Sequence, residues 1–404
     1  MSDKIELLAP AGNFEKLEIA LHYGADAVYL AGKDFSLRNF SGNFTLPEMG
    51  AAVRLAHGLG KKVYVACNIY PRNHELKAIE AYLAQLGAAR PDAVIVADPG
   101  IFEMAREIIP EIPLHISTQA NTTHWADAVF WKKMGAVRVN AARELHLSEI
   151  SEIVRKSHMD VECFVHGAMC ISYSGRCLLS SFMAGRDSNR GLCCHPCRWQ
   201  YAVMEETRPG KFMPVMEDQR GTYIFNSRDL CMIEHLPEMI QAGITSLKIE
   251  GRMKGIHYIA AVVKTYREAL DAWYQDPACY QLNDAWIAEL LRISHRGYST
   301  GFYLGNPDQI SPNFDNYKSF QDHVFLGKIL ASDAGQSIVC DVRNKIRRGE
   351  SIEILVRKGP PQPDSVLAIT DMEGAPLDEA RTGTRVRLAL NGAYAPCDLI
   401  RKAE

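Results

Sequence analysis

Short apolar runs rich in β-branched residues alternate with longer stretches of helical periodicity along most of this 404-residue chain. Strands that alternate with helices pair in parallel, because every crossover between parallel neighbours needs a helix. Eight runs are predicted as strands: residues 5–8, 27–30, 63–66, 93–96, 114–116, 137–139, 160–165 and 246–249. Eight parallel strands favour an α/β fold of the (β/α)8, TIM-like barrel type. The alternative is a doubly wound open sheet, but no Gly-x-Gly-x-x-Gly follows the first strand.

Two departures from this alternation divide the chain. Between the seventh and eighth predicted strands, an insertion leaves the barrel at the end where barrel enzymes keep their active sites. From residue 322, runs such as VFLGKIL, SIVCDVR and RVRLAL are separated by Gly, Asp and Pro turns, which is typical of a small β-barrel. We therefore predict a TIM-like barrel over residues 1–320, with a cysteine-rich insertion at about 167–245, and a C-terminal all-β barrel domain over 321–404.

Cysteines concentrate at this insertion. Residues 162–199 hold six of the chain's eleven cysteines: Cys163, Cys170, Cys177, Cys193, Cys194 and Cys197. Thiolates select zinc, cuprous copper or iron–sulfur clusters. The spacing disfavours a disulfide framework, and zinc knuckles of the Cys-x(2–4)-Cys type occur only with Cys197 as the second member. A 4Fe-4S cluster fits best, because its four thiolates can come from well-separated positions.

The same stretch resembles a known family. Gly167-Ala168-Met169-Cys170, followed by Gly175, Cys177 and Ser180, is similar to the signature of the collagenase-like peptidase family U32. The similarity extends from LLAPAGN near the start through SLKIEGRMK to the C-terminal portion. Most similar is the tRNA-hydroxylation branch of the family. The resemblance implies an iron–sulfur-dependent, oxygen-independent tRNA hydroxylase that forms 5-hydroxyuridine at the wobble position, with prephenate as a small-molecule cosubstrate.

The resemblance also implies the metal ligands. Cys170 and Cys177 match the signature, and Cys193 aligns as the third ligand of the 4Fe-4S cluster. The fourth is either Cys231 or Cys197, since related hydroxylases use both arrangements. We favour Cys231, because a ligand from outside the loop would tie the loop to the helix that follows it.

The carboxyl ends of barrel strands supply the other candidate site residues. The catalytic candidates are His166, Glu144 and Glu250. The substrate-binding candidates are Arg38, Asn68, Gln119, Asn121, Asn140, Arg143, Lys248 and Arg252. Such a polar ring suits a planar nucleobase and an anionic cosubstrate, and the arginine fork matches carboxylates.

Structural roles compete with several of these assignments. Arg143 and Glu144 could cap the helix that begins near LHLSEI. Because side chains alternate along a strand, only one face of Lys248, Glu250 and Arg252 would point into the barrel. His166, which precedes a glycine, could be a structural histidine.

Charge and composition limit the function classes. A net charge of −3 argues against an indiscriminate nucleic-acid binder but permits a local basic face for tRNA. The chain has no apolar run near the roughly 20 residues of a membrane span and no N-terminal leader, so we expect a cytoplasmic protein with no membrane contact. A U32-type peptidase is the alternative enzyme, but neither Gly-x-Ser-x-Gly nor His-Glu-x-x-His is present. A non-enzymatic Fe-S RNA-binding factor is the third possibility.

Overall fold

The computed structural model describes residues 4–36, 42–170, 172–199, 202–204, 212–214, 228–305, 324–333 and 337–403. The chain forms two compact units. The barrel unit comprises Met1–Leu17, Ala25–Lys254 and His295–Ser319, and the C-terminal unit comprises Glu18–Gly24, Gly255–Ser294 and Phe320–Glu404. The sequence-based domain limits at 1–320 and 321–404 stay a prediction.

Eight parallel strands close the barrel, as the alternation of strands and helices predicts. They are β1 (Glu6–Pro10), β2 (Ala27–Ala31), β3 (Lys62–Cys67), β4 (Ala93–Val96), β5 (Leu114–Ile116), β6 (Arg138–Asn140), β7 (Asp160–Ala168) and β11 (Ser246–Ile249). Each pairs with the next, and β11 pairs with both β1 and β7, which confirms the TIM-like fold. A short extension follows β7, where β10 (Asp229–Cys231) pairs antiparallel with β7 and β12 (Tyr298–Ser299) pairs with β10.

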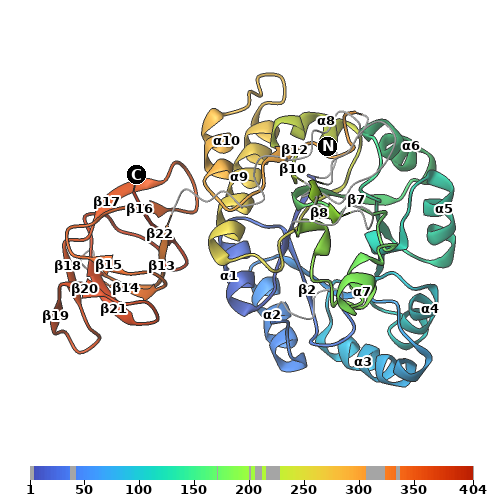
Figure 1. Cartoon of the computed structure of the whole chain (residues 1–404), viewed down its shortest axis with the longest axis horizontal. Coiled ribbons are helices and arrows are strands. Elements are labelled where there is room, and N and C mark those ends of the chain that lie inside the picture. The colour runs from blue at the N-terminus through green and yellow to red at the C-terminus, as the bar shows by residue number, and fades with distance from the viewer. Residues whose placement is uncertain are drawn as a thin grey trace. The chain divides into compact units, whose positions relative to one another are not determined.

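Helices cover the outside of these strands (Figure 1). They include α2 (Leu46–Gly58), α3 (Leu76–Ala89), α4 (Pro99–Ile108), α5 (Trp125–Met134), α6 (Leu147–Ser157) and α8 (Leu236–Gln241), while α1 (Phe14–His22) follows β1. Their starts obey local rules. Thr45 and Glu48 form a capping box at α2, and the Asp98 carboxylate accepts from two backbone N–H groups at the start of α4. Such caps satisfy donors that would otherwise lack partners and fix where each helix begins.

The insertion holds little regular structure among its described residues. It contains α7 (Leu179–Ala184), and β8 (Ala202–Met204) pairs with β9 (Phe212–Pro214). Short 3-10 turns at Ser188–Arg190 and Pro196–Arg198 lie between them. The part of the insertion from Cys170 to Cys197, which we call the cysteine loop, is therefore shaped largely by turns. Turns let thiols from distant positions in the sequence come together.

Among its described residues, the C-terminal unit is all-β apart from two helices and the part of α1 that it contains. Its main sheet has the order β17 (Gln362–Ser365), β16 (Ser351–Leu355), β22 (Leu399–Lys402), β13 (Phe325–Asp333), β14 (Ser337–Val342), β21 (Arg385–Ala389), β18 (Ala368–Thr370) and β19 (Pro376–Leu377). A second pair joins β15 (Ile346–Arg347) to β20 (Glu379–Ala380). Burial alternates along β14, so one face of this strand packs on the core. The prediction of C-terminal β structure is confirmed.

Within this unit, a buried arginine joins a helix to the sheet. Arg401 on β22 is fully buried and donates to both carboxylate oxygens of Glu289 at 2.6 and 2.9 Å. Its Nε donates to Glu353 on β16 at 2.9 Å. Glu289 belongs to α10 (Asp284–Leu291), which follows α9 (Ile256–Gln275). The bidentate pair fixes α10 against β22.

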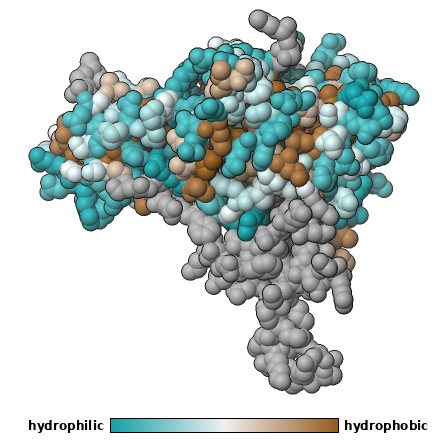
Figure 2. Space-filling model, turned by 90° about the horizontal axis from the view of Figure 1, so that it is seen from above, coloured by the Kyte–Doolittle hydropathy of each residue, from teal (hydrophilic) through white to brown (hydrophobic). Residues whose placement is uncertain are grey.

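The described surface is mixed in polarity. On the face drawn in Figure 2, hydrophilic side chains predominate and apolar ones form small patches. Among the helices of the described ranges, none is long and apolar enough to cross a membrane.

Candidate active site at the barrel mouth

A hollow lies at the carboxyl ends of the barrel strands, and we call it the mouth pocket. It encloses about 540 Å³ when the space at its opening is included. Its lining residues are Tyr29, Ala66, Asn68, Ile95, Ser117, Thr118, Gln119, Asn140, Arg143, Phe164, Lys248, Glu250 and Arg252. Seven of the predicted site residues are therefore brought together: Asn68, Gln119, Asn140, Arg143, Lys248, Glu250 and Arg252. The size and position suit a small-molecule or nucleobase site.

Three cations border the mouth pocket. The Lys248 ammonium lies 4.4 Å from the centre of the Tyr29 ring, and the Arg143 guanidinium lies 3.9 Å from that of Phe164. Arg252 is buried and donates from Nη2 to Ser36 at 3.2 Å. Rings and cations at these distances attract one another, which holds the two side chains in place. The pocket, which Glu250 also lines, therefore presents cationic donors to hydrogen-bond acceptors on a ligand.

Strand alternation does not separate the polar residues at the end of β11. Lys248, Glu250 and Arg252 all line the mouth pocket, and their spacing of two residues places them on one face of an extended chain. β11 ends at Ile249, so Glu250 and Arg252 reach the mouth pocket from the loop that follows the strand.

The mouth pocket also presents amide oxygens that lack partners. Asn68 Oδ1, Gln119 Oε1 and Asn140 Oδ1 are buried and have no hydrogen-bond partner among the described residues. The amide nitrogen of Asn68 donates to Ser117 at 3.0 Å, and that of Asn140 donates to Glu162 at 2.8 Å. An unpaired buried acceptor costs about 1–3 kcal/mol. These oxygens are therefore suited to accept hydrogen bonds from a ligand.

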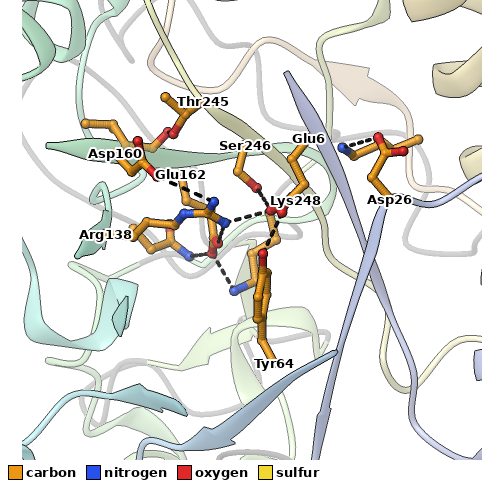
Figure 3. A network of polar contacts seen from close by, with 12 residues as sticks. Glu6, Asp26, Tyr64, Arg138, Asp160, Glu162, Thr245, Ser246 and Lys248 are labelled. Carbon is orange, nitrogen blue, oxygen red and sulfur yellow. Dashed lines mark hydrogen bonds and ion pairs between the residues drawn. The ribbon is translucent and has the colours of Figure 1, made fainter. Parts of the chain in front are cut away.

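A network of buried charges inside the barrel supports the mouth pocket (Figure 3). Glu6 accepts from Arg138 at 2.6 Å, from Tyr64 at 2.5 Å and from Ser246 at 2.8 Å. Glu162 accepts from Lys248 at 2.7 Å, and its second oxygen lies 3.7 Å from Arg138. Burial raises the pKa of Tyr64, so this hydroxyl remains a donor to Glu6. Two carboxylates and two cations thus balance one another in the interior, as buried charges require.

A second hollow lies in the cysteine loop, and we call it the thiol hollow. Cys170, Cys177, Cys193 and Cys197 all line it. It shares three lining residues with the mouth pocket: Thr118, Gln119 and Arg143. The Arg143 guanidinium donates to Cys170 Sγ at 3.5 Å and to the Ala168 carbonyl at 3.2 Å. The two hollows are therefore neighbours separated by a shared wall.

The donor set of the thiol hollow fits a 4Fe-4S cluster. Four thiols are the number that a cubane needs. Within the part of the chain that the structure describes, no three His, Cys, Asp or Glu side chains are placed to hold a single metal ion.

Two other cysteines, Cys194 and Cys231, are not among the described residues that line the thiol hollow. Cys194 Sγ lies 3.3 Å from the hydroxyl of Ser180, whose oxygen also accepts from the Cys194 N–H. Cys231, the favoured fourth ligand, lies on β10 opposite His166 and is not among the described residues that line the hollow. The alternative fourth ligand, Cys197, is one of them.

A glycine lets the cysteine loop approach the barrel. Gly175 has φ +74°, and a Cβ added there would lie 2.2 Å from the Gln119 carbonyl oxygen and 2.9 Å from the Tyr70 hydroxyl. The Tyr70 hydroxyl donates to the same carbonyl. Arg190 in the loop pairs with both oxygens of Glu75 at 2.7 Å. These contacts hold the loop against the ends of the barrel strands.

Glu144 holds the cysteine loop from another side. Its carboxylate accepts from the Ser174 N–H at 3.0 Å and from the Ser174 hydroxyl at 3.3 Å. Burial raises the pKa of Glu144. Neither Glu144 nor Arg143 caps α6, because the N-cap is His146 and the carboxylate that accepts from its N–H belongs to Glu149. Glu144 is not among the described residues of either hollow.

The remaining predicted residues either line neither hollow or fall outside the described residues. His166 is buried on β7, its ring centre is 5.2 Å from that of Tyr298, and burial lowers its pKa to about 3. Asn121 has φ +58° and ends the 3-10 turn Thr118–Ala120, a conformation that Asn tolerates better than most residues. Arg38 falls within 37–41, outside the described residues. Catalytic and binding roles for these three stay predictions.

Comparison with known proteins assigns the family. Residues 12–313 match the profile of peptidase family U32, and residues 321–401 match that of the peptidase family U32 C-terminal domain. The chain belongs to peptidase family U32.

Curated relatives of this U32 chain extend over nearly its full length. It is 39% identical to tRNA hydroxylation protein P1 of Bacillus subtilis, over 100% of this chain and 96% of that protein. Identity to tRNA hydroxylation protein P of Escherichia coli is 37%, over 88% of this chain and 87% of that protein. A 23S rRNA 5-hydroxycytidine synthase of Escherichia coli is 34% identical, over 88% of this chain and 53% of that protein.

Sequence reasoning missed part of the site of this U32 chain. Glu162 contacts Asn140 and Lys248 of the mouth pocket but was not among the candidates, and neither were Glu6, Tyr64 and Arg138, which are linked to these lining residues through Glu162. The available signal was a charged residue inside an otherwise apolar strand, as with Glu162 in β7. Buried strands rarely carry unpaired charges, so each such residue implies a partner.

Proposed function

We propose that this chain is an RNA-modifying hydroxylase that acts on tRNA. The observation that carries the proposal is the pair of adjoining hollows, one lined by polar groups at the barrel mouth and one lined by four thiols. The names of its full-length relatives support the reaction and the substrate class. In this reading the mouth pocket takes the target base, and the shared wall places it beside the thiol hollow.

The proposed cofactor is a 4Fe-4S cluster. Cys170, Cys177 and Cys193 would be ligands, with Cys197 in place of the initially favoured Cys231, because Cys197 shares their hollow. When bound, such a cluster with four thiolate ligands would supply electron transfer. The Arg143 guanidinium would donate to the Cys170 sulfur, and hydrogen bonds to ligand sulfurs adjust the reduction potential of a cluster.

The finer reaction in our proposal is formation of 5-hydroxyuridine at the wobble position, with prephenate as cosubstrate. Lys248, Arg143 and Arg252 border the mouth pocket and match the negative charge of such a cosubstrate. Closing the base into a pocket of buried polar groups would exclude water and fix its orientation. Arg38 stays a further candidate for carboxylate binding.

Nucleoside mass spectrometry tests the reaction. A strain that lacks this chain should lose 5-hydroxyuridine derivatives from tRNA, and restoring the chain should return them, while 5-hydroxycytidine in rRNA stays constant. Loss of the rRNA nucleoside instead would redirect the proposal to rRNA. Unchanged nucleosides in both RNAs would refute it, and tRNA binding without any change would favour a non-enzymatic RNA-binding factor.

Metal analysis tests the cofactor. Protein purified without oxygen should contain about four irons per chain. Cys197→Ser should lower this content, whereas Cys194→Ser, which changes a neighbouring thiol outside the hollow, should not. Zinc without iron in the wild type would rule out the cluster. If Cys231→Ser lowers the iron content and Cys197→Ser does not, the fourth ligand is Cys231.

A cysteine peptidase is the second candidate, because His195 lines the same hollow as the four thiols and the family carries a peptidase label. Casein cleavage by metal-free protein that is abolished by His195→Gln would favour it over the hydroxylase.

A further inference from the structure

One carboxylate oxygen deep in the barrel organises a wall of the mouth pocket. Glu162 Oε1 accepts from the amide nitrogen of Asn140 at 2.8 Å and from the ammonium of Lys248 at 2.7 Å. The three residues lie on neighbouring strands, since β7 pairs with β6 on one side and with β11 on the other. Glu162 is 2% exposed, so this contact is shielded from water.

Glu162 decides which way the Asn140 amide points. The ends of an amide are nearly indistinguishable by shape, but a carboxylate that is paired with cations offers only acceptors. The NH2 of Asn140 must therefore face Glu162, and Oδ1 must face away from it. Asn140 Oδ1 is buried and lacks a hydrogen-bond partner within the described ranges, and Asn140 lines the mouth pocket.

The wall thus has a fixed hydrogen-bond pattern. Asn140 presents an acceptor, and beside it Lys248 presents an ammonium that contacts Glu162 but has further protons to donate. The Tyr29 ring under the ammonium restricts its position. A complementary ligand edge has an N–H beside a C=O.

We propose that Glu162 is a positioning residue that fixes this pattern and so makes the mouth pocket selective for an imide edge, as on uracil. The inference rests on the proposed function, because it names the edge of the base that the hydroxylase reads. Cytosine carries an acceptor at the ring nitrogen and a donor at the exocyclic amine. In the position where uracil N3–H would face Asn140, cytosine opposes acceptor to acceptor and donor to donor, which leaves buried groups unpaired.

The pattern depends on charge and not only on packing. Arg138 lies 3.7 Å from Glu162 Oε2 and pairs with Glu6 at 2.6 Å. Glu6 is not among the lining residues and contacts Arg138, Tyr64 and Ser246. It is therefore a matched control, since it is a carboxylate of the same network with no direct contact to the pocket wall.

The test measures base preference with anticodon stem-loops that carry either U or C at the target position. We expect the wild-type protein to bind the U loop at least tenfold more tightly, the factor that corresponds to about 1.4 kcal/mol. Glu162→Gln should abolish most of this preference. The new amide can donate to Asn140, so the Asn140 side chain can turn over and present its NH2 to the pocket instead of its oxygen. Affinity that comes from contacts with the RNA phosphates should remain, because it does not depend on the base.

Two further variants separate positioning from stability. Glu162→Gln combined with Asn140→Asp moves the carboxylate across the same hydrogen bond, so an acceptor faces the pocket again and the preference should return. Glu6→Gln should lower the unfolding temperature without changing the preference. Asn140→Ala removes the acceptor directly and gives the same readout should Glu162→Gln not fold.

The outcomes distinguish the two proposals. Folded Glu162→Gln protein that keeps its preference for U would overturn the positioning role, as would wild-type protein that hydroxylates tRNA but binds both loops equally. In both cases the hydroxylase proposal stands. Absence of hydroxylation in the nucleoside assay removes the proposed function, and the base preference of Glu162→Gln still reports whether the wall works as inferred.

Discussion

Gly175 offers a sharp test of how the cysteine loop is held. An alanine there meets two obstacles. A side chain at φ +74° costs about 1–2 kcal/mol. The new Cβ would also lie 2.2 Å from the Gln119 carbonyl oxygen, a backbone atom that cannot rotate away. Overpacking of this kind costs a further 1–3 kcal/mol. Gly175→Ala should therefore either detach the loop from the barrel or lower the free energy of unfolding by about 2–5 kcal/mol.

Gly185 provides a matched control in the same loop. Its φ is +63°, but an added Cβ would have nothing within 4 Å. Gly185→Ala should therefore show only the conformational cost of about 1–2 kcal/mol. The pair isolates the steric contact from the backbone conformation, because both substitutions add one methyl group at a positive φ.

Two assays together read the result. Urea unfolding gives the global free energy, and trypsin cleavage at the loop arginines reports local detachment. Gly175→Ala should be cleaved faster than both the wild type and Gly185→Ala, or should lose more stability than Gly185→Ala. Identical behaviour of the two variants in both assays would show that the loop does not approach Gln119 as described.

Three further predictions concern other parts of the chain. Arg401→Met should destabilise the protein by about 3–5 kcal/mol in urea unfolding, because it leaves the Glu289 carboxylate buried without its partner, and Arg401→Met with Glu289→Leu should recover much of the loss. The hydrogen bond from Arg190 lowers the pKa of Glu75 to about 2, so the stabilisation from this pair is complete above pH 4.5 and is lost as the pH falls from there toward 2. Glu75→Gln should flatten the pH dependence of unfolding in that window, and an unchanged profile would contradict the pairing. Burial raises the pKa of Cys340 to about 12, so alkylation at pH 8 should leave this thiol unmodified until the protein unfolds, as peptide mass spectrometry can detect.

The barrel was predictable because its strands are continuous apolar runs bounded by helices. Parallel strands are buried on both faces, so β2 and β4 consist almost wholly of Ala, Val, Ile, Leu and Tyr. The C-terminal strands were predictable for the opposite reason. One side of each faces the core, which gives the alternation seen in β14. Both patterns are local, and local patterns are what a sequence displays directly.

The site was predictable only as far as strand ends could be located. Asn68, Gln119 and Asn140 follow or end apolar runs, and their places at the mouth pocket follow from the barrel. His166 sits on a strand that continues past the mouth, because β7 extends to Ala168 to pair with β10. That extension depends on distant residues, and so does the choice between Cys197 and Cys231. Contacts between segments far apart in sequence leave no local pattern.

Arg143 is one of the three residues that line both hollows. Its guanidinium touches a cysteine sulfur on one side and lines the base-sized cavity on the other. A change in the electron density on that sulfur alters the electrostatic field of Arg143 in the mouth pocket. A ligand in the mouth pocket that contacts Arg143 in turn alters the hydrogen bond to the sulfur. If the thiol hollow holds a cluster as proposed, a substitution on either side of Arg143 should be read for effects on both the cluster and ligand binding.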